Sequence, residues 1–354
     1  MKKYFLLKTI LFVAALNFIF TYNGFAQCCA GSSGCSISGG ASTGVLQEGQ
    51  FELSTNLQFI NANKFYQNDK LAPDSVRTFD SYNSSYQYFK IGYGITKNFT
   101  LSVENGYYFK KEEVGLNENP ATTYKSNGIG DLILFPRYDV LNKAHGNIHN
   151  EITIGTGFKI PLGSYNDSIG SVEPFSGKTF YVVKPTAVQL SSGAHDIIFY
   201  TFLYRGWVRQ NFKLFANAFY IKKGYNANGE KLGDYASVAL FAGKSFFNHL
   251  GVILQARYEH VSRMKINNNI LLFGKPSNYF PEATGYKKVY ITPQVSYTQG
   301  KFTLFATSDF PVYQYLNTSD FYTQVGSQHQ TTLGLTFRFY ANKDLKKGVG
   351  AATM

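Results

Sequence analysis

The sequence predicts an all-β protein, an antiparallel up-and-down transmembrane β-barrel of about 12 strands with both termini periplasmic. Aromatic residues make up 17% of the 354 residues, and charged residues make up only 16%, whereas ordinary soluble domains carry about 25% charge. Beyond the N-terminus no apolar run approaches the roughly 18–20 residues that a membrane-spanning helix needs. Long segments instead alternate apolar and polar residues with a period of two, and the connections between them alternate between long and short.

Residues 1–26 are expected to be a secretory signal peptide. Lysines flank the apolar stretch 10–20, and Gly24-Phe25-Ala26 forms a small-x-small cleavage site. A membrane anchor is the alternative, but the apolar stretch is short for a spanning helix. Export and the lack of a clustered basic stripe disfavour nucleic-acid binding as the reason for the net charge of +12.

Residues 27–48 form a Gly- and Ser-rich segment that carries all the cysteines of the chain, Cys28, Cys29 and Cys35. In an oxidising compartment three thiols allow one local disulfide and leave one spare. A soft-metal or haem-related thiol site is the alternative, although Cys-Cys-x5-Cys is not a known zinc spacing. Lipidation of Cys28 is disfavoured because Gln27, and not a small residue, precedes it.

Residues 49–340 are expected to form the barrel, and 341–354 a Lys- and Gly-rich tail. In 51–59 the odd positions are mostly apolar, whereas in 151–160 the even positions are. Segments of about 10 residues exceed the usual soluble strand of 5–6 and fit a tilted crossing of a bilayer. In chain order the predicted strands are 50–60, 82–96, 98–109, 128–141, 147–160, 194–208, 211–222, 233–246, 248–262, 286–298, 300–310 and 328–340.

The connections between these strands alternate strictly in length. Tight turns are expected at 96–98, 142–146, 209–210, 247 and 299–300, and each intervening connection is longer. Outer-membrane barrels have this pattern, with short periplasmic turns and long outer loops. A soluble β-sandwich, the alternative, rarely has strands of this length and would have a polar outer face.

The apolar face of each strand is expected to meet lipid, because a charge at mid-bilayer costs about 2–4 kcal/mol. The other face then lines the lumen, where both signs of charge are mixed, which argues against strong selectivity for anions or cations. Cross-strand ion pairs that fill a narrow barrel are the simpler interpretation, and a charged binding site is the alternative. The predicted lumen-facing residues are Glu52, Lys90, Glu104, Asp131, Arg137, Asp139, Glu151, Lys159, Arg257, Glu259, Lys288 and Arg338.

Asp131 and Arg137 share the inward face but lie about 20 Å apart along a strand, so each needs a partner on a neighbouring strand. Glu104 and Glu151 are the candidates for Arg137. Water, an inward loop or the N-terminal segment is expected to occupy the space that 12 strands leave.

Tyrosines near the strand ends predict aromatic girdles at the level of the lipid headgroups. A tyrosine-lined passage for aromatic solutes is the alternative. These residues are Tyr86, Tyr88, Tyr93, Tyr107, Tyr108, Tyr138, Tyr200, Tyr204 and Tyr258.

Three motifs carry a family resemblance. The stretch 128–138 reads Gly-Ile-Gly-Asp-Leu-Ile-Leu-Phe-Pro-Arg-Tyr, 158–163 reads Phe-Lys-Ile-Pro-Leu-Gly, and 189–196 reads Gln-Leu-Ser-Ser-Gly-Ala-His-Asp. These stretches resemble the outer-membrane barrels named for phenol-degradation meta-pathway transport, which are related to FadL-like channels for hydrophobic compounds. The resemblance covers roughly 128–208 and implies a transporter or channel for small, hydrophobic or aromatic solutes. The signal and the composition also resemble a Bacteroidetes-type exported protein.

A structural or surface-interaction barrel, with a closed lumen and partner-binding outer loops, is the second hypothesis. An enzyme is not expected, because barrel lipases need a third group to orient their histidine and neither His260 nor His329 has an evident one in the sequence. No cofactor and no metal site is predicted. In the outer membrane the expected partners are lipid, a small-molecule solute and, during biogenesis, the barrel assembly machinery. The oligomeric state is left open.

Overall fold

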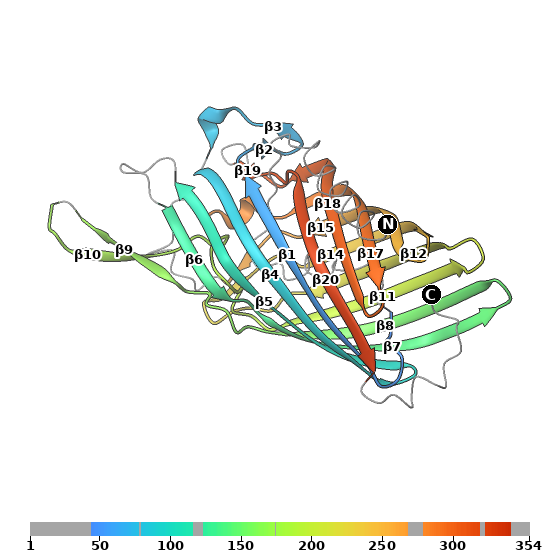
Figure 1. Cartoon of the computed structure of the whole chain (residues 1–354). Helices are drawn as coiled ribbons and strands as arrows, with labels where there is room; N and C mark the ends of the chain where they lie inside the picture. The colour runs from blue at the N-terminus through green and yellow to red at the C-terminus, as the bar shows by residue number, and fades with distance from the viewer. Residues whose placement is uncertain are drawn as a thin grey trace, which may run out of the picture.

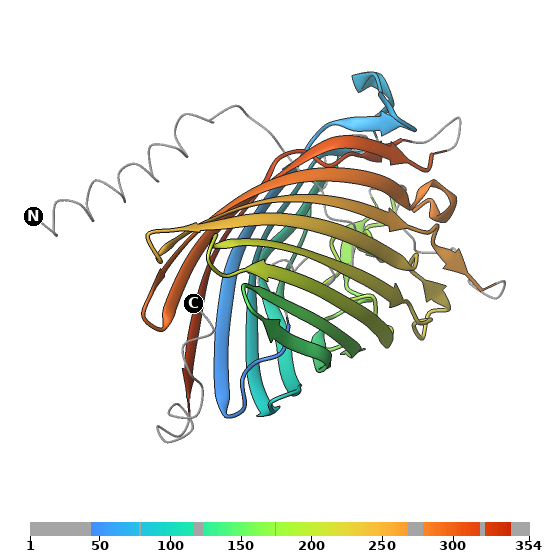
Figure 2. The ribbon, with the colours of Figure 1, turned by 90° about the vertical axis from the view of Figure 1, so that its right-hand side faces the viewer.

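The structure, a computed structural model, describes residues 44–77, 79–115, 123–173, 175–267, 279–318 and 323–340. The predicted signal peptide, the three cysteines and the tail 341–354 lie outside these residues. Twelve long strands form the wall of the molecule (Figures 1 and 2). They are β1 (Gln50–Ala62), β4 (Phe79–Thr96), β5 (Phe99–Gly115), β7 (Leu132–His145), β8 (Ile148–Ile160), β11 (Asp196–Trp207), β12 (Phe212–Lys222), β14 (Tyr235–Phe246), β15 (Leu250–Val261), β17 (Tyr286–Gln299), β18 (Phe302–Leu316) and β20 (Gln330–Tyr340).

The wall is a closed antiparallel barrel. Each long strand pairs with the next one along the chain, and β20 pairs with β1 in a register that runs from Gln50 opposite Tyr340 to Phe59 opposite Thr331. Closure pairs each of the twelve long strands with a neighbour on both sides, which satisfies the backbone groups as a bilayer requires. The predicted all-β barrel of 12 strands is therefore confirmed.

The two ends of the barrel differ, as the connection lengths predicted. At the short-turn end the predicted turn 142–146 shrinks to Gly146 and Asn147, because residues 142–145 pair with β8. Gly146 has a φ of 57°, a left-handed conformation that glycine adopts without strain. The opposite end, the long-loop end, carries the long connections.

One strand is interrupted where the sequence predicted continuity. Strand β6 (Thr123–Ile129) pairs with the outer part of β5, and β7 begins at Leu132 after a break at Gly130 and Asp131. Gly128 has a φ of 142°, which side-chain-bearing residues rarely adopt. A Cβ on Gly163 would lie 2.8 Å from the Ile129 carbonyl oxygen, so the chain after β8 packs closely against β6.

The long connections contain short elements of their own. They are β2 (Phe65–Gln67), β3 (Lys70–Leu71), β9 (Ser168–Val172), β10 (Thr179–Val183), β13 (Glu230–Lys231), β16 (Lys265–Ile266), β19 (Gln324–Val325) and the 3-10 turns η2 (Asp74–Val76) and η3 (Pro281–Ala283). The hairpin β9–β10 projects away from the barrel (Figure 1). Among the described residues no helix is long and apolar enough to cross a membrane.

The two faces of the wall have the expected inside-out polarity. Ile154 and Leu335 are 48% and 37% exposed, whereas their neighbours Thr153 and Thr336 are 0% and 7% exposed. From Glu52 to Phe59 on β1 the exposed positions are apolar and the buried ones are polar. An exterior that exposes leucine, isoleucine and phenylalanine in every second position fits hydrocarbon as its solvent.

Candidate functional site: the barrel lumen

A first ion network joins the first and last strands at the short-turn end. Glu52 on β1 lies 2.8 Å from Lys90 on β4 and 2.6 Å from Arg338 on β20. Glu104 stands opposite Lys90 in the β4–β5 register and accepts a hydrogen bond from Ser102 Oγ at 3.1 Å. The closing seam of the barrel is thus bridged by charge on its inner face.

A second ion network lies at the long-loop end of β8, β11 and β12. Lys159 Nζ lies 2.5 Å from Asp131 Oδ2 and 3.0 Å from Asp196 Oδ2, and it donates to Ser192 Oγ at 2.8 Å. Lys223 reaches the same oxygen of Asp196 at 3.0 Å. These side chains are buried and connect the break before β7 with the ends of β8, β11 and β12.

A third network lies on β15, β17 and β18. Arg257 contacts Glu259 at 2.9 Å and Asp309 at 3.1 Å, and its guanidinium lies 4.8 Å from the ring centre of Tyr290. Lys288 donates to Ser327 Oγ at 2.7 Å. Cations near ring faces gain from the ring quadrupole when water is excluded.

The twelve predicted lumen-facing residues all lie on the inner face or its rim. Glu151, Arg257 and Arg338 are partly buried. The other nine are buried: Glu52, Lys90, Glu104, Asp131, Arg137, Asp139, Lys159, Glu259 and Lys288. Asp139 and Glu151 are joined through Thr153, whose hydroxyl lies 3.3 Å and 2.9 Å from the two carboxylates.

Arg137 anchors the chain that precedes β1. Its Nη1 donates to the Gly44 carbonyl oxygen at 2.8 Å, and Thr100 Oγ1 accepts from the Leu46 amide at 2.7 Å. Thr100 is fully buried on the inner face, so residues 44–46 lie against the inside of the wall. Sequence reasoning looked for carboxylate partners and missed this backbone acceptor, which no charge pattern reveals.

A second inward segment comes from the connection between β8 and β11. Val188 and Ser191 are 0% and 3% exposed, and the Gln189 carbonyl accepts from Lys111 Nζ at 2.5 Å. Lys159 holds the same segment from β8 through Ser192. Residues 185–194 are thus held from β5 and from β8 inside the long-loop end of the barrel. They correspond to the inward loop, one of the expected occupants of the lumen.

Aromatic side chains on the inner face of β7, β11, β12 and β14 form a ladder that consists of two groups of ring contacts within one buried cluster. The ring centroids of Phe135 and Tyr200 lie 5.5 Å apart, and those of Tyr200 and Phe219 lie 4.6 Å apart. The ladder continues through Phe202, Phe215 and Phe241, with Phe215 stacked on Phe241 at 4.3 Å. The lumen therefore has an aromatic wall in addition to its ion networks.

The girdle interpretation is wrong for part of the tyrosine set. Tyr86, Tyr88 and Tyr200 are 9%, 2% and 3% exposed and face inward. Tyr86 and Tyr88 precede Lys90 in steps of two, so the same parity that placed Lys90 in the lumen places them there. Tyr93, Tyr138 and Tyr258 are 36%, 49% and 43% exposed and face outward.

The structure also brings together a Ser–His pair that the sequence did not reveal. Ser308 Oγ lies 2.6 Å from His329 Nε2, and the His329 ring stacks on Phe310 at 4.8 Å. No described residue contacts His329 Nδ1, so the third group of a catalytic triad is not present among them. Among the described residues no group of His, Cys, Asp and Glu is placed to hold a metal ion.

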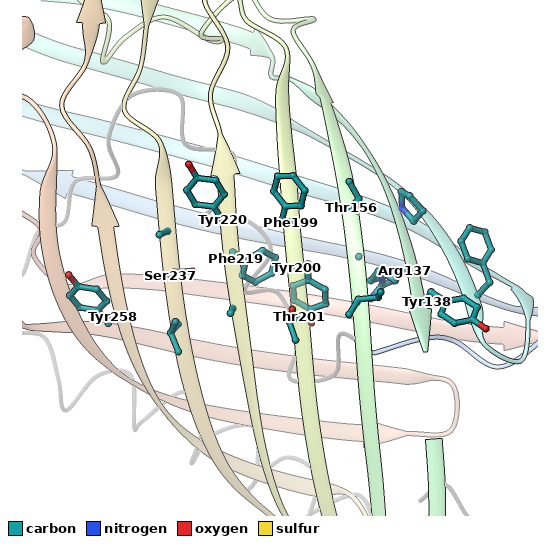
Figure 3. A pocket seen from close by; sticks show the side chains of 17 residues that line it. Arg137, Tyr138, Thr156, Phe199, Tyr200, Thr201, Phe219, Tyr220, Ser237 and Tyr258 are labelled. Atoms are coloured by element: carbon teal, nitrogen blue, oxygen red, sulfur yellow. The ribbon is translucent and has the colours of Figure 1, made fainter. Parts of the chain in front are cut away.

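A depression of about 600 Å³ lies on the lipid-facing side of the wall, outside the lumen (Figure 3). Its rim is aromatic and its floor consists of small side chains and exposed backbone. The rim residues are Phe99, Tyr138, Phe199, Tyr220 and Tyr258, and the floor residues include Gly155, Thr156, Thr201, Ala218 and Ala236.

No family model and no curated protein matches this chain. Among solved structures, the COG4313 outer membrane channel from Pseudomonas putida F1 is similar with a TM-score of 0.56 at 10% identity, covering 85% of this chain and 100% of that one. A FadL homologue from Pseudomonas aeruginosa has a TM-score of 0.39 at 11% identity, covering 89% and 99%. The likeness to the first structure supports the fold: the chain is a closed 12-stranded β-barrel of the outer-membrane type.

Proposed function

We propose that this protein is an outer-membrane channel for small hydrophobic or aromatic solutes. The observation that carries the proposal is the aromatic ladder on the inner face of β7, β11, β12 and β14. Four rings of the ladder are only 1–6% exposed, so a planar solute must replace ring–ring contacts as it passes. Aromatic pairs contribute about 0.5–1.5 kcal/mol beyond their buried area, so each replacement gives the solute a similar, weak site. Weak, repeated sites favour passage over retention.

In this proposal the short-turn end and both termini face the periplasm, as in other outer-membrane barrels. The ion networks around Glu52, Lys159 and Arg257 form the polar boundary of the passage. Residues 185–194 act as its gate, since they lie inside the long-loop end and are held by side-chain contacts that can exchange without breaking the wall.

A specific observation favours a second candidate, a surface-interaction barrel with a closed lumen. Arg137, Lys159 and Lys288 are 2%, 1% and 1% exposed, so water barely reaches these inward charges. At the tip of the β9–β10 connection Phe175 is 98% exposed, and Tyr181 is 71% exposed. Exposed aromatic side chains on a projecting hairpin suit contact with a partner.

Solute flux into liposomes separates the two candidates. The reconstituted barrel is expected to admit a small aromatic solute faster than a sugar of similar size. Phe219→Leu, which interrupts the ladder, should slow only the aromatic solute. Phe158→Leu is the matched control, because Phe158 lies on the outward, lipid-facing side of β8 and is 49% exposed. Absence of any flux through a correctly folded barrel would reject the channel and favour the closed barrel.

A further inference from the structure

The depression on the lipid-facing wall is a consequence of strand register. Ile154, Thr201, Ala218, Val238 and Tyr258 stand side by side on five consecutive strands, each paired with the next. Thr201 and Ala218 are smaller than Ile154 on one side of them and Val238 and Tyr258 on the other. A hollow therefore forms over β11 and β12, and the rings of Phe199 and Tyr220 stack at 6.3 Å along its edge (Figure 3).

The depression lies near the middle of the bilayer. Trp207 and Phe212 pack at 5.5 Å at the short-turn ends of β11 and β12, where aromatic side chains mark the headgroup level. From Phe212 to Ala218 the strand rises about 20 Å. With a tilt of roughly 45°, that corresponds to about half of the ~30 Å hydrocarbon core.

Two cations stand at the headgroup end of the same surface. Arg205 on β11 and Lys244 on β14 both point outward and are exposed. Arg205 Nε donates to Asn150 Oδ1 at 2.8 Å, which holds the guanidinium on the outer surface. This hydrogen bond does not use the two Nη groups. Lys244 lies beside Phe246, 5.6 Å from the ring centre. Each is one strand away from β12, on opposite sides.

Apolar side chains connect the cations with the depression, and Leu214, 42% exposed, stands between Arg205 and Ala242. Ala216 precedes Ala218 on the outward face of β12, and Ala242 precedes Lys244 on the outward face of β14. Leu203 and Leu240 flank this line and are 46% and 61% exposed. The surface therefore offers a shallow apolar track with a positive end.

We propose that this surface binds one glycerophospholipid from the leaflet at the short-turn end, with the phosphate between Arg205 and Lys244 and an acyl chain lying along the track into the depression. The track has the length of one leaflet and is lined mainly by apolar side chains, which fits an acyl chain. The charge at its end is complementary to a phosphate. A small solute would leave the cations unused, and the aromatic rim leaves a second barrel no flat face to pack on.

Native mass spectrometry of the detergent-purified full chain, with dioleoylphosphatidylglycerol or dioleoylphosphatidylcholine added, tests the proposal. The parent is expected to retain one lipid and to retain several-fold more phosphatidylglycerol than phosphatidylcholine. Ala218→Trp, which fills the depression, should lower retention of both lipids at least fivefold. The double variant Arg205→Gln/Lys244→Gln should instead abolish the preference between them.

Two matched controls keep the test specific. Ala306→Trp adds the same bulk on the outward face of β18. Lys287→Gln removes an exposed cation from β17 at the long-loop end of the barrel, away from Arg205 and Lys244. Neither should change lipid retention. Equal loss in Ala218→Trp and Ala306→Trp would overturn the proposal. It would also be overturned if the parent were a dimer that Ala218→Trp converts to monomers, since the occupant would then be a second copy.

Discussion

Replacing Lys159 with methionine is expected to destabilise the barrel strongly. The substitution keeps most of the side-chain volume and removes the ammonium that contacts Asp131, Asp196 and Ser192. Asp196 keeps Lys223 at 3.0 Å, whereas Asp131 loses the ion pair that the structure gives it. Stripping a buried charge of its partner costs about 3–5 kcal/mol, and we expect a loss near the lower limit because a carboxyl group can protonate.

The measurement is urea unfolding of the barrel in lipid vesicles, followed by the fluorescence of Trp207, the single tryptophan of the chain. Asp131→Asn combined with Lys159→Met should recover a large part of the loss, because the stranded charge is then removed. Lys222→Met, an exposed change on the outward face of β12, is the control and should alter stability by less than about 0.5 kcal/mol. A loss below about 1 kcal/mol for Lys159→Met would refute the reasoning and would mean that water already solvates this network.

Three further outcomes are expected. Ile154→Arg should cost about 2–4 kcal/mol in folding into bilayers, whereas Thr153→Arg should cost less because two carboxylates lie within reach; comparable damage would mean that the faces are reversed. Arg137→Ala should cost about 1.5–3 kcal/mol in urea unfolding by removing its charged donor from the Gly44 carbonyl, and an equally stable variant with raised conductance would show that this arginine lines an open passage. Gly128→Ala should cost roughly 1–3 kcal/mol in the same assay, because φ is 142° there and the new Cβ would lie 2.9 Å from Leu190 Cδ1; an unchanged midpoint would contradict the strain argument.

The positions of the strands and the direction of each side chain followed from the sequence to a large extent. A period of two assigns every residue of a strand to one of two faces, and a bilayer outside the barrel makes the apolar face the outer one. Ile154 and Thr153 therefore lie where the alternation predicts. The tyrosine error at Tyr86 and Tyr88 came from applying a composition rule where the parity with Lys90 already gave the answer.

The break at Gly130 and Asp131 was beyond the reach of the alternation pattern. Residues 128–141 alternate well enough to predict one strand, and a glycine alone does not reveal whether its strand bends or ends. The break forms because the chain after β8 and residues 185–194 pack beside β6. Only contacts between distant parts of the chain determine that arrangement.

The partners of the charged and polar side chains were decided by the tertiary structure. Lys159 meets Asp131 and Asp196, Arg137 meets the Gly44 carbonyl, and Ser308 meets His329. In each case the alternation fixes a face, but the height at which neighbouring strands pair depends on the tilt and stagger with which the barrel closes. A shift of two residues in one register keeps every side chain on its face and changes every partner. The sequence by itself thus determined which face of its strand each side chain occupies, because the alternation has a period of two, and barrel closure decided which side chains touch.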